Sequence, residues 1–466
     1  MRRSAALLAL LGAGCASMEP AYQRPAPAIP TSWPVGDPYL RRSEAALPAV
    51  TYRQVFQDPR LQTLIEQALV NNRDLAEAAA NIAAAREQYR IQRAGQLPQV
   101  DANAGVDVSG SEDSSGVDAS YSLGAGVSSF EIDLFGRLRS LTKVQLNRYF
   151  ATESGARATR LTLVADIAGA WLTHAADSSL LSIARQTADS AEKSVRLTRL
   201  RLEGGVAPRT DLRQAELVLT QAQADLARQR TAVAQDVNAL QLLVGAPIEP
   251  RLLSGSIEEA SGSVAALPPG VNSYVLLRRP DVVEAEYQLR AANAQIGAAR
   301  AALFPRISLT GLAGLASSAL TSLFTGGAFV WSAGADATYT IFQAGAGRAN
   351  VRLSEAQRAA AVAAYQRTVQ TAFREVADAL ARRGTINDEI AARQRQRAAA
   401  ADVYLLTEAR YRAGIDNFLA SLDAQRSYYS AQRSLVQTQL AAAQNLVDLY
   451  EALGGDSLLL PPPARP

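Results

Sequence analysis

Two of the side chains that most often carry out covalent or acid–base chemistry occur only once each in this chain. Cys15 is the only cysteine and His174 the only histidine among 466 residues. One cysteine excludes an internal disulfide, and one Cys with one His cannot complete a Cys/His zinc site. A Ser-His-Asp or Cys-His pair would have to use His174, which lies inside a predicted long helix. We therefore expect a packed or solvated His174, no catalytic residues, no metal site and no enzyme activity.

Charge and glycine patterns exclude two further classes of function. Lys and Arg total 47 against 44 Asp and Glu, so there is no basic excess of the kind that nucleic-acid binding requires. The segment 343–347, QAGAG, lacks the Lys-Ser/Thr pair that follows in a phosphate-binding loop. We expect neither a nucleic-acid partner nor a nucleotide cofactor.

Cys15 ends a segment with the pattern of a bacterial lipoprotein signal peptide, residues 1–14. Two arginines precede a short apolar run, and small residues lead to the cysteine. Cleavage before Cys15 would free its thiol for lipid attachment. The pattern usually has a large aliphatic residue three positions before the cysteine, where this chain has Gly12, with Leu11 one position further back. The alternative is an ordinary signal peptide with an incidental cysteine. The covalent lipid on Cys15 is the only prosthetic group that we expect.

Proline separates extended segments from regular ones. Seven prolines from Pro20 to Pro48, both included, predict an N-terminal extended strap, residues 15–57. No proline occurs between Pro98 and Pro208 or between Pro305 and Pro461. Because proline interrupts helices and strand ladders, these two stretches must hold long regular elements.

The chain is internally duplicated. At a constant offset of 207, residues 74–100 match residues 281–307, and after a three-residue shift Gly204 matches Gly414. We therefore divide the chain into a first repeat (58–245), a linker (246–278), a second repeat (279–455) and a tail (456–466). A repeat this long indicates a fold with internal pseudo-symmetry.

Each repeat predicts a short helix, two strands, a very long helix and a medium helix. Segments without helix breakers predict the helices 74–96, 136–204, 208–245, 347–414 and 416–454. Apolar and polar residues alternate strictly in 117–128, which predicts strands with one apolar and one polar face. The two hairpins are expected at 99–133 and 306–342. Residues 307–335 carry no charge and could also be a transmembrane helix, but they alternate and contain several glycines.

The strands predict an oligomer. Four strands with an apolar face toward lipid cannot leave their edges open in a membrane, and four are too few to close a barrel. A dimer would give eight strands and a filled interior, whereas twelve or more would enclose water. A solvated coiled-coil rod is the alternative for the helices, but it does not explain the hairpins.

Several motifs resemble those of the TolC/OprM-like outer-membrane factors, in particular the lipoprotein efflux channels of the NodT-type branch. The matching stretches are YQRP (22–25), FQDPRLQTLIEQALVNNRDL (56–75), FEIDLFGRLRS (130–140), FPRISLTG (304–311) and YRAGIDNFLASLDAQRS (411–427). The resemblance covers the chain from Cys15 to Gly455. It implies a mainly α homotrimer in which a twelve-stranded transmembrane β-barrel continues as a long periplasmic α-helical barrel, with an equatorial belt around 246–278.

The resemblance also implies a function. Such a channel is the passive exit duct of a tripartite efflux system, lipid-anchored in the bacterial outer membrane. Its partners are a periplasmic adaptor (a membrane fusion protein) and an inner-membrane transporter. The outer-membrane component of a type I protein secretion system is the alternative within this class. A stand-alone porin is disfavoured because porins lack helices of this length.

The family pattern places a gate at the periplasmic tip. It carries the constriction onto Leu419 and Asp423, which lie four residues apart and so can share one helix face. Contacts that hold the gate closed are expected at Tyr411 and Arg426, with Asp211 as a weaker candidate. The docking points for adaptor hairpins are expected at the two tip turns: Gly204, Gly205, Val206, Gly414, Ile415 and Asp416.

Overall fold

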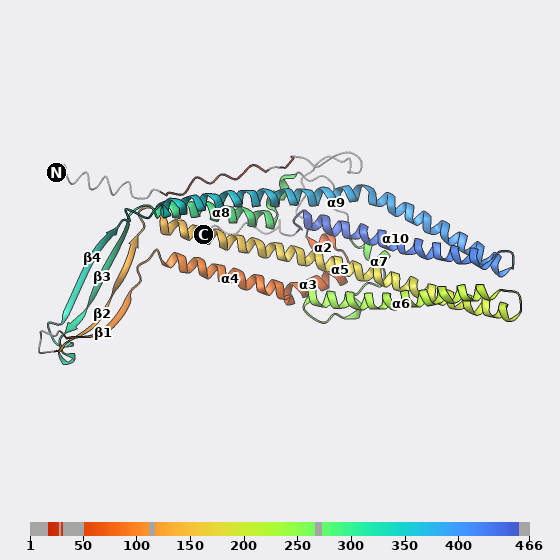
Figure 1. Cartoon of the computed structure of the whole chain (residues 1–466), viewed down its shortest axis with the longest axis horizontal. Helices are drawn as coiled ribbons and strands as arrows, with labels where there is room; N and C mark the ends of the chain where they lie inside the picture. Colours follow the sequence, from red (N-terminus) through yellow and green to blue (C-terminus); the bar gives the residue numbers. More distant parts are fainter. Residues whose placement is uncertain (1–16, 28, 31–50, 111–116, 266–272, 456–466) are drawn as a thin grey trace. The chain divides into compact units, whose positions relative to one another are not determined.

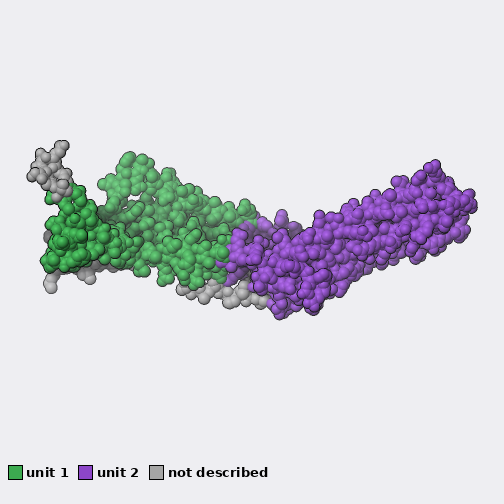
Figure 2. All heavy atoms as spheres, turned by 90° about the horizontal axis from the view of Figure 1, so that it is seen from below, with its two compact units in different colours: residues 1–26, 80–154, 283–367 green, residues 27–79, 155–282, 368–466 purple. Residues whose placement is uncertain are grey.

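The computed structural model describes residues 17–27, 29–30, 51–110, 117–265 and 273–455 (Figure 1). Cys15, the predicted signal peptide and the tail 456–466 lie outside these residues, as do parts of the strap and of the linker. The chain forms two compact units (Figure 2). Unit 1 comprises residues 1–26, 80–154 and 283–367, and unit 2 comprises residues 27–79, 155–282 and 368–466.

The helices follow the duplicated order that the sequence predicts. The two longest, α5 (Arg137–Glu203) and α9 (Ala346–Arg412), have 67 residues each. The others are α2 (Tyr52–Val55), α3 (Pro59–Asn71), α4 (Arg73–Ala94), α6 (Arg209–Val244), α7 (Ile257–Gly262), α8 (Pro280–Ala301) and α10 (Phe418–Ala452). Short 3-10 helices are η1 (Pro250–Leu252), η2 (Ser273–Arg278) and η3 (Leu320–Ser322). The predicted ends of the long helices agree with the observed ends to within two residues.

Unit 1 contains one antiparallel sheet of four strands in the order β1-β2-β3-β4. The strands are β1 (Asp101–Gly110), β2 (Val117–Ile132), β3 (Arg306–Ser317) and β4 (Phe329–Thr338). Along one face of the sheet the register places mainly apolar residues opposite one another. Leu123 pairs with Ala104 on one side and with Leu315 on the other, and Trp331 pairs with Ala313. The two predicted hairpins therefore share one apolar face, and the polar residues share the opposite face.

A bulge keeps this face continuous. The pairing of β2 with β3 shifts between Val127 and Phe130. Before the bulge the apolar residues of β2 are odd-numbered, and after it Phe130 pairs with Leu309. The extra residue moves the even-numbered positions onto the apolar face, because side chains alternate with a period of two. The strict alternation in 117–128 does not predict this shift.

The transmembrane-helix alternative for 307–335 is wrong. These residues form β3, η3 and most of β4, with ten paired positions between the two strands. Among the described residues, none of the helices combines the length and the apolar character needed to cross a membrane.

The main core of unit 2 gathers α3, α5, α7 and α10 around large side chains that are fully buried. Trp171 donates its indole N–H to the Leu252 carbonyl at 2.9 Å, which fastens the linker to α5. Phe56 meets Tyr450 edge-to-face, with ring centroids 5.3 Å apart. The linker contributes η1 and α7, elements that the sequence analysis did not assign, and Ile257 of α7 is fully buried. The linker is therefore part of the core of this unit.

Candidate gate and docking tips

The tips are the two turns that end the 67-residue helices, and both lie at the same end of unit 2 (Figure 1). Gly205 and Gly414 adopt left-handed φ values of 71° and 76°, a region that glycine enters without steric cost. In each turn an N–H five residues on closes the helix: Val206 donates to the Arg201 carbonyl, and Ile415 donates to the Arg410 carbonyl, both at 2.9 Å. The two repeats thus end in the same glycine-capped turn.

These turns present apolar side chains to solvent. Val206 is 68% exposed and Ile415 is 63% exposed. Gly204, Gly205 and Gly414 are also exposed, so five of the six predicted docking residues are exposed at the two turns. Asp416 differs from the others, because Arg410 donates two hydrogen bonds to its carboxylate at 2.7 and 3.0 Å. These hydrogen bonds hold the pKa of Asp416 below its usual value.

Tyr411 lies in a small core that joins α9 to α5. Tyr411 is 6% exposed, and the centroids of its ring and the Phe418 ring lie 5.2 Å apart. The Arg201 guanidinium sits over the Tyr411 ring at 4.7 Å and also donates to its carbonyl oxygen at 2.9 Å. The hydroxyls of Tyr411 and Thr198 lie 3.4 Å apart. Tyr411 of α9 and Arg201 of α5 therefore connect two helices of one chain, and we call this contact the tether. Arg201 contributes the positive charge to it.

The structure does not bring Arg426 or Asp211 to this tether. Arg426 is exposed on α10 and lines a groove of about 420 Å³ together with Asp225 and Tyr429. Asp211 lies in the first turn of α6, where its backbone N–H donates to the Pro208 carbonyl at 3.1 Å. Within the described part of one chain, neither side chain has a hydrogen bond or ion pair. Their assignment as gate tethers stays a prediction.

Leu419 and Asp423 occupy one face of α10 directly after the tip. Asn417 caps this helix by accepting the Ala420 N–H at 3.0 Å. Phe418 and Leu422 are buried against the chain, whereas Leu419 is 52% exposed and Asp423 is also exposed. The two predicted constriction residues therefore point away from the core of their own chain and remain available to other copies.

Arg201 is the tip residue that sequence reasoning missed, and the duplication contained a signal for it. Gly204 of the first repeat matches Gly414 of the second, and Arg201 and Tyr411 each lie three residues before those glycines. The two positions are equivalent in the two repeats, and the structure brings them into contact. Equivalent positions can meet in this way when two repeats pack around a pseudo-symmetry axis.

His174 lies well away from the tips, in the core of unit 2. It is 5% exposed, and burial holds the pKa of its imidazole below the usual value. In the neighbouring part of α6, burial and the nearby Asp177 carboxylate raise the pKa of Asp236 to about 6. Gln229 donates to Asp177 at 2.9 Å. The low exposure of the His174 side chain shows that it is packed and not solvated.

A duplicated pair of very long helices, closed by glycine-capped tips and joined to a two-faced sheet, defines the class of outer-membrane channels that continue into a helical stalk. The model of the family described as outer membrane efflux protein matches residues 64–246 and 272–455, once in each repeat. The chain belongs to this family and is an outer-membrane protein.

Individual relatives agree with that assignment. The chain is 43% identical to a Pseudomonas putida protein named probable efflux pump outer membrane protein TtgC, over 97% of this chain and 95% of the relative. It is 40% identical to outer membrane protein OprJ of Pseudomonas aeruginosa, over 97% and 95% of the two chains. The open state of the MtrE outer membrane channel of Neisseria gonorrhoeae superposes with a TM-score of 0.86 at 36% identity, covering 95% of this chain and 98% of MtrE.

Proposed function

We propose that this protein is the passive exit duct of a tripartite efflux pump and that it exports small molecules through a channel gated at its periplasmic tip. The observation that carries the proposal is the sheet, which has one continuous apolar face and one polar face. Such a sheet can face lipid on one side and water on the other. The names of the relatives favour efflux over type I protein secretion.

The duct forms as a homotrimer. The order β1-β2-β3-β4 leaves β1 and β4 as edges, and edge strands cannot stay unpaired in lipid. Three copies of a four-stranded sheet give twelve strands, enough to enclose a water-filled lumen. The helices support the same assembly, because none of the 22 residues of α4 is buried within its own chain.

The closed tip is formed by Leu419 and Asp423 of three chains. Both side chains face away from their own core, so three-fold symmetry can bring three leucines and three carboxylates together at the axis. Apposed carboxylates repel one another unless they are protonated or paired with cations. The closed state therefore depends on contacts elsewhere, and the tether between Arg201 and Tyr411 supplies one of them.

The periplasmic adaptor docks on the exposed tip turns, and the inner-membrane transporter supplies the energy. A deletion strain complemented with the wild-type gene tests this function by measuring intracellular accumulation of a fluorescent pump substrate. Complementation should lower accumulation only when the matching adaptor and transporter are also present. Equal accumulation with and without the gene would contradict the duct assignment.

The two faces of the sheet should respond differently to the same substitution. Leu123→Arg places a charge on the lipid face and should cost about 2–4 kcal/mol near the membrane midplane. Ser122→Arg, the neighbouring residue on the polar face, should insert normally and change the conductance instead. Folding yield in outer-membrane fractions and single-channel conductance measure the two effects. Equal loss of insertion for both variants would show that the faces are assigned wrongly.

Lipid attachment is expected at Cys15, which lies outside the described residues. Mass spectrometry of the mature N-terminus should find a diacylglyceryl and acyl modification on this residue. Cys15→Ser should remove the lipid but leave a trimer that still inserts, because the strands hold the protein in the membrane. An unmodified Cys15 in the mature wild-type protein, or cleavage at another position, would contradict the assignment.

A further inference from the structure

The strap segment 17–26 contacts helix α8 in unit 1. Its residues meet α8 in reverse order: the Pro20 carbonyl accepts a hydrogen bond from Asn293 at 2.8 Å, and further along the strap Tyr22 and Arg24 meet Glu286. Glu19 also forms an ion pair with Lys143 of α5 at 2.8 Å. The strap is therefore antiparallel to α8. Its N-terminal end lies beside the C-terminal part of α8, and β3 begins five residues after that helix ends.

The centre of this contact is the carboxylate of Glu286. Its side chain is only 5% exposed. It accepts hydrogen bonds from Arg24 and from Tyr22 of the strap, the latter at 3.3 Å, and from Arg290 of its own helix at 2.6 Å. The Arg290 guanidinium also sits 5.1 Å from the centre of the Tyr22 ring. Burial raises the pKa of Glu286, but the hydrogen bonds from Arg24 and Arg290 outweigh burial and hold the pKa below its usual value.

The surface that the strap covers contains buried polar groups, which are unusual where one helix packs on another. Asn293 is fully buried and Tyr365 is 1% exposed, yet the side-chain Oδ1 of Asn293 and the Tyr365 hydroxyl have no hydrogen-bond partner within the described residues. Gly297 leaves room for the strap backbone, because a Cβ there would lie 2.9 Å from the Glu19 Cα. Buried polar groups of this kind are costly in helix packing and suit a hydrophilic peptide or ordered water.

We propose that the face of α8 formed by Glu286, Arg290, Asn293 and Gly297 is a peptide-binding seat, whose ligand is the Tyr22–Arg24 motif of this chain's own strap. Occupation of the seat directs the N-terminal end of the strap toward the sheet end of unit 1. This end of the strap, residue 17, follows Cys15 by two residues in the sequence. If Cys15 carries the lipid proposed above, the seat connects that lipid anchor to helix α8 of the channel. The proposal of a seat is based on the contacts between the strap and α8, and it does not depend on the proposed export function.

The physical reason for a specific motif is the buried carboxylate. Without Arg24, Glu286 keeps one guanidinium partner and loses a charge-assisted hydrogen bond to a carboxylate that is only 5% exposed, although the Arg24 side chain is itself 45% exposed. Loss of one such bond weakens binding by roughly tenfold or more. A seat that only covered apolar surface would not distinguish Arg24 from another long side chain.

The test uses the full chain as a Cys15→Ser variant exported behind a cleavable leader, with a protease site placed within residues 31–50. After cleavage, the strap is held only by non-covalent contacts. A fluorescent peptide of residues 17–27 is then added to the purified trimer, and its exchange into the seat is followed by anisotropy. The wild-type peptide should displace the strap, and the Arg24→Met peptide, which keeps a long side chain but no charge, should bind roughly tenfold more weakly.

Two variants of the chain complete the design. Glu286→Gln should speed strap release after cleavage, whereas Arg300→Ala should not, although it also removes an ion pair from α8, to Glu355 at 2.9 Å. Because the peptide comparison uses one unmodified seat, it remains decisive even if Glu286→Gln does not fold. Equal binding of the wild-type and Arg24→Met peptides, or equal release from both variants, would overturn the proposal. None of these measurements involves transport, so their failure is distinct from failure of the export function.

Discussion

Arg279→Met is expected to destabilise the protein by about 3 kcal/mol, the largest effect on the packing of unit 2 that we predict for a single substitution. The Arg279 side chain is 9% exposed and joins three elements of unit 2. It donates to Asp281 at the start of α8, to Glu375 of α9 at 2.9 Å and to the Ala452 carbonyl at the end of α10 at 2.8 Å. Methionine keeps much of the volume but leaves the Ala452 carbonyl and two carboxylates without this donor.

The expected cost is at the lower end for a broken buried ion pair, because Asp281 and Glu375 are 37% and 39% exposed and stay partly solvated. Loss of helical circular dichroism in increasing urea measures the change as a lower midpoint. Arg251→Ala is the control. Arg251 forms an ion pair with Glu249, but the two side chains are 80% and 59% exposed, so this ion pair should contribute little to stability. Equal midpoints for Arg279→Met and Arg251→Ala would show that Arg279 does not hold the three helix ends together.

Arg201→Ala should shift the tip toward its open state and produce the largest change in conductance. The substitution removes both the hydrogen bond to the Tyr411 carbonyl and the cation–π contact with its ring. A hydrogen bond from a charged group is worth about 1.5–3 kcal/mol, so the ratio of open to closed channels should rise by roughly tenfold or more. Single-channel recordings in planar bilayers measure this ratio directly.

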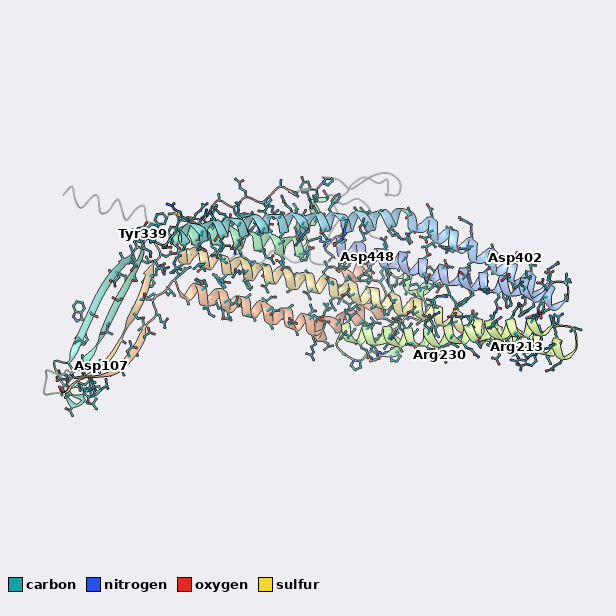
Figure 3. All side chains as sticks on the ribbon, viewed as in Figure 1. Asp107, Arg213, Arg230, Tyr339, Asp402 and Asp448 are labelled. Atoms are coloured by element: carbon teal, nitrogen blue, oxygen red, sulfur yellow. The ribbon has the colours of Figure 1, made fainter. Side chains whose placement is uncertain are left out.

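A nearby arginine provides the control for that experiment. Arg213 lies on α6 close to the tip (Figure 3) and pairs with Glu216 at 2.6 Å on the exposed surface. Arg213→Ala changes the charge of the tip by the same amount but leaves the tether intact. Its open fraction should stay at the wild-type value. Equal opening in both variants would indicate that net charge controls the tip, and an unchanged Arg201→Ala channel would place the closing contacts elsewhere.

The sequence by itself determined the long helices and the strands, with the ends of the long helices placed to within two residues. The absence of proline, together with Gly204 and Gly414, located the two long helices, because breakers act locally and need no tertiary partner. Period-two alternation located the strands and separated their faces for the same reason. The duplication then related the two halves, and the family motifs named the class of channel to which the comparisons also assign the chain.

Only the tertiary structure decided which side chains meet. Arg201 and Tyr411 are 210 residues apart, and Arg24 and Glu286 are 262 residues apart. Local periodicity cannot select such partners, because the choice depends on how helices pack and rotate against each other. The bulge after Val127 also depends on tertiary structure, because it adjusts the pairing of β2 with β3, a strand that is distant in the sequence. Arg426 shows the converse: a motif assigned it a contact, but within one chain the packing of α10 turns it toward solvent.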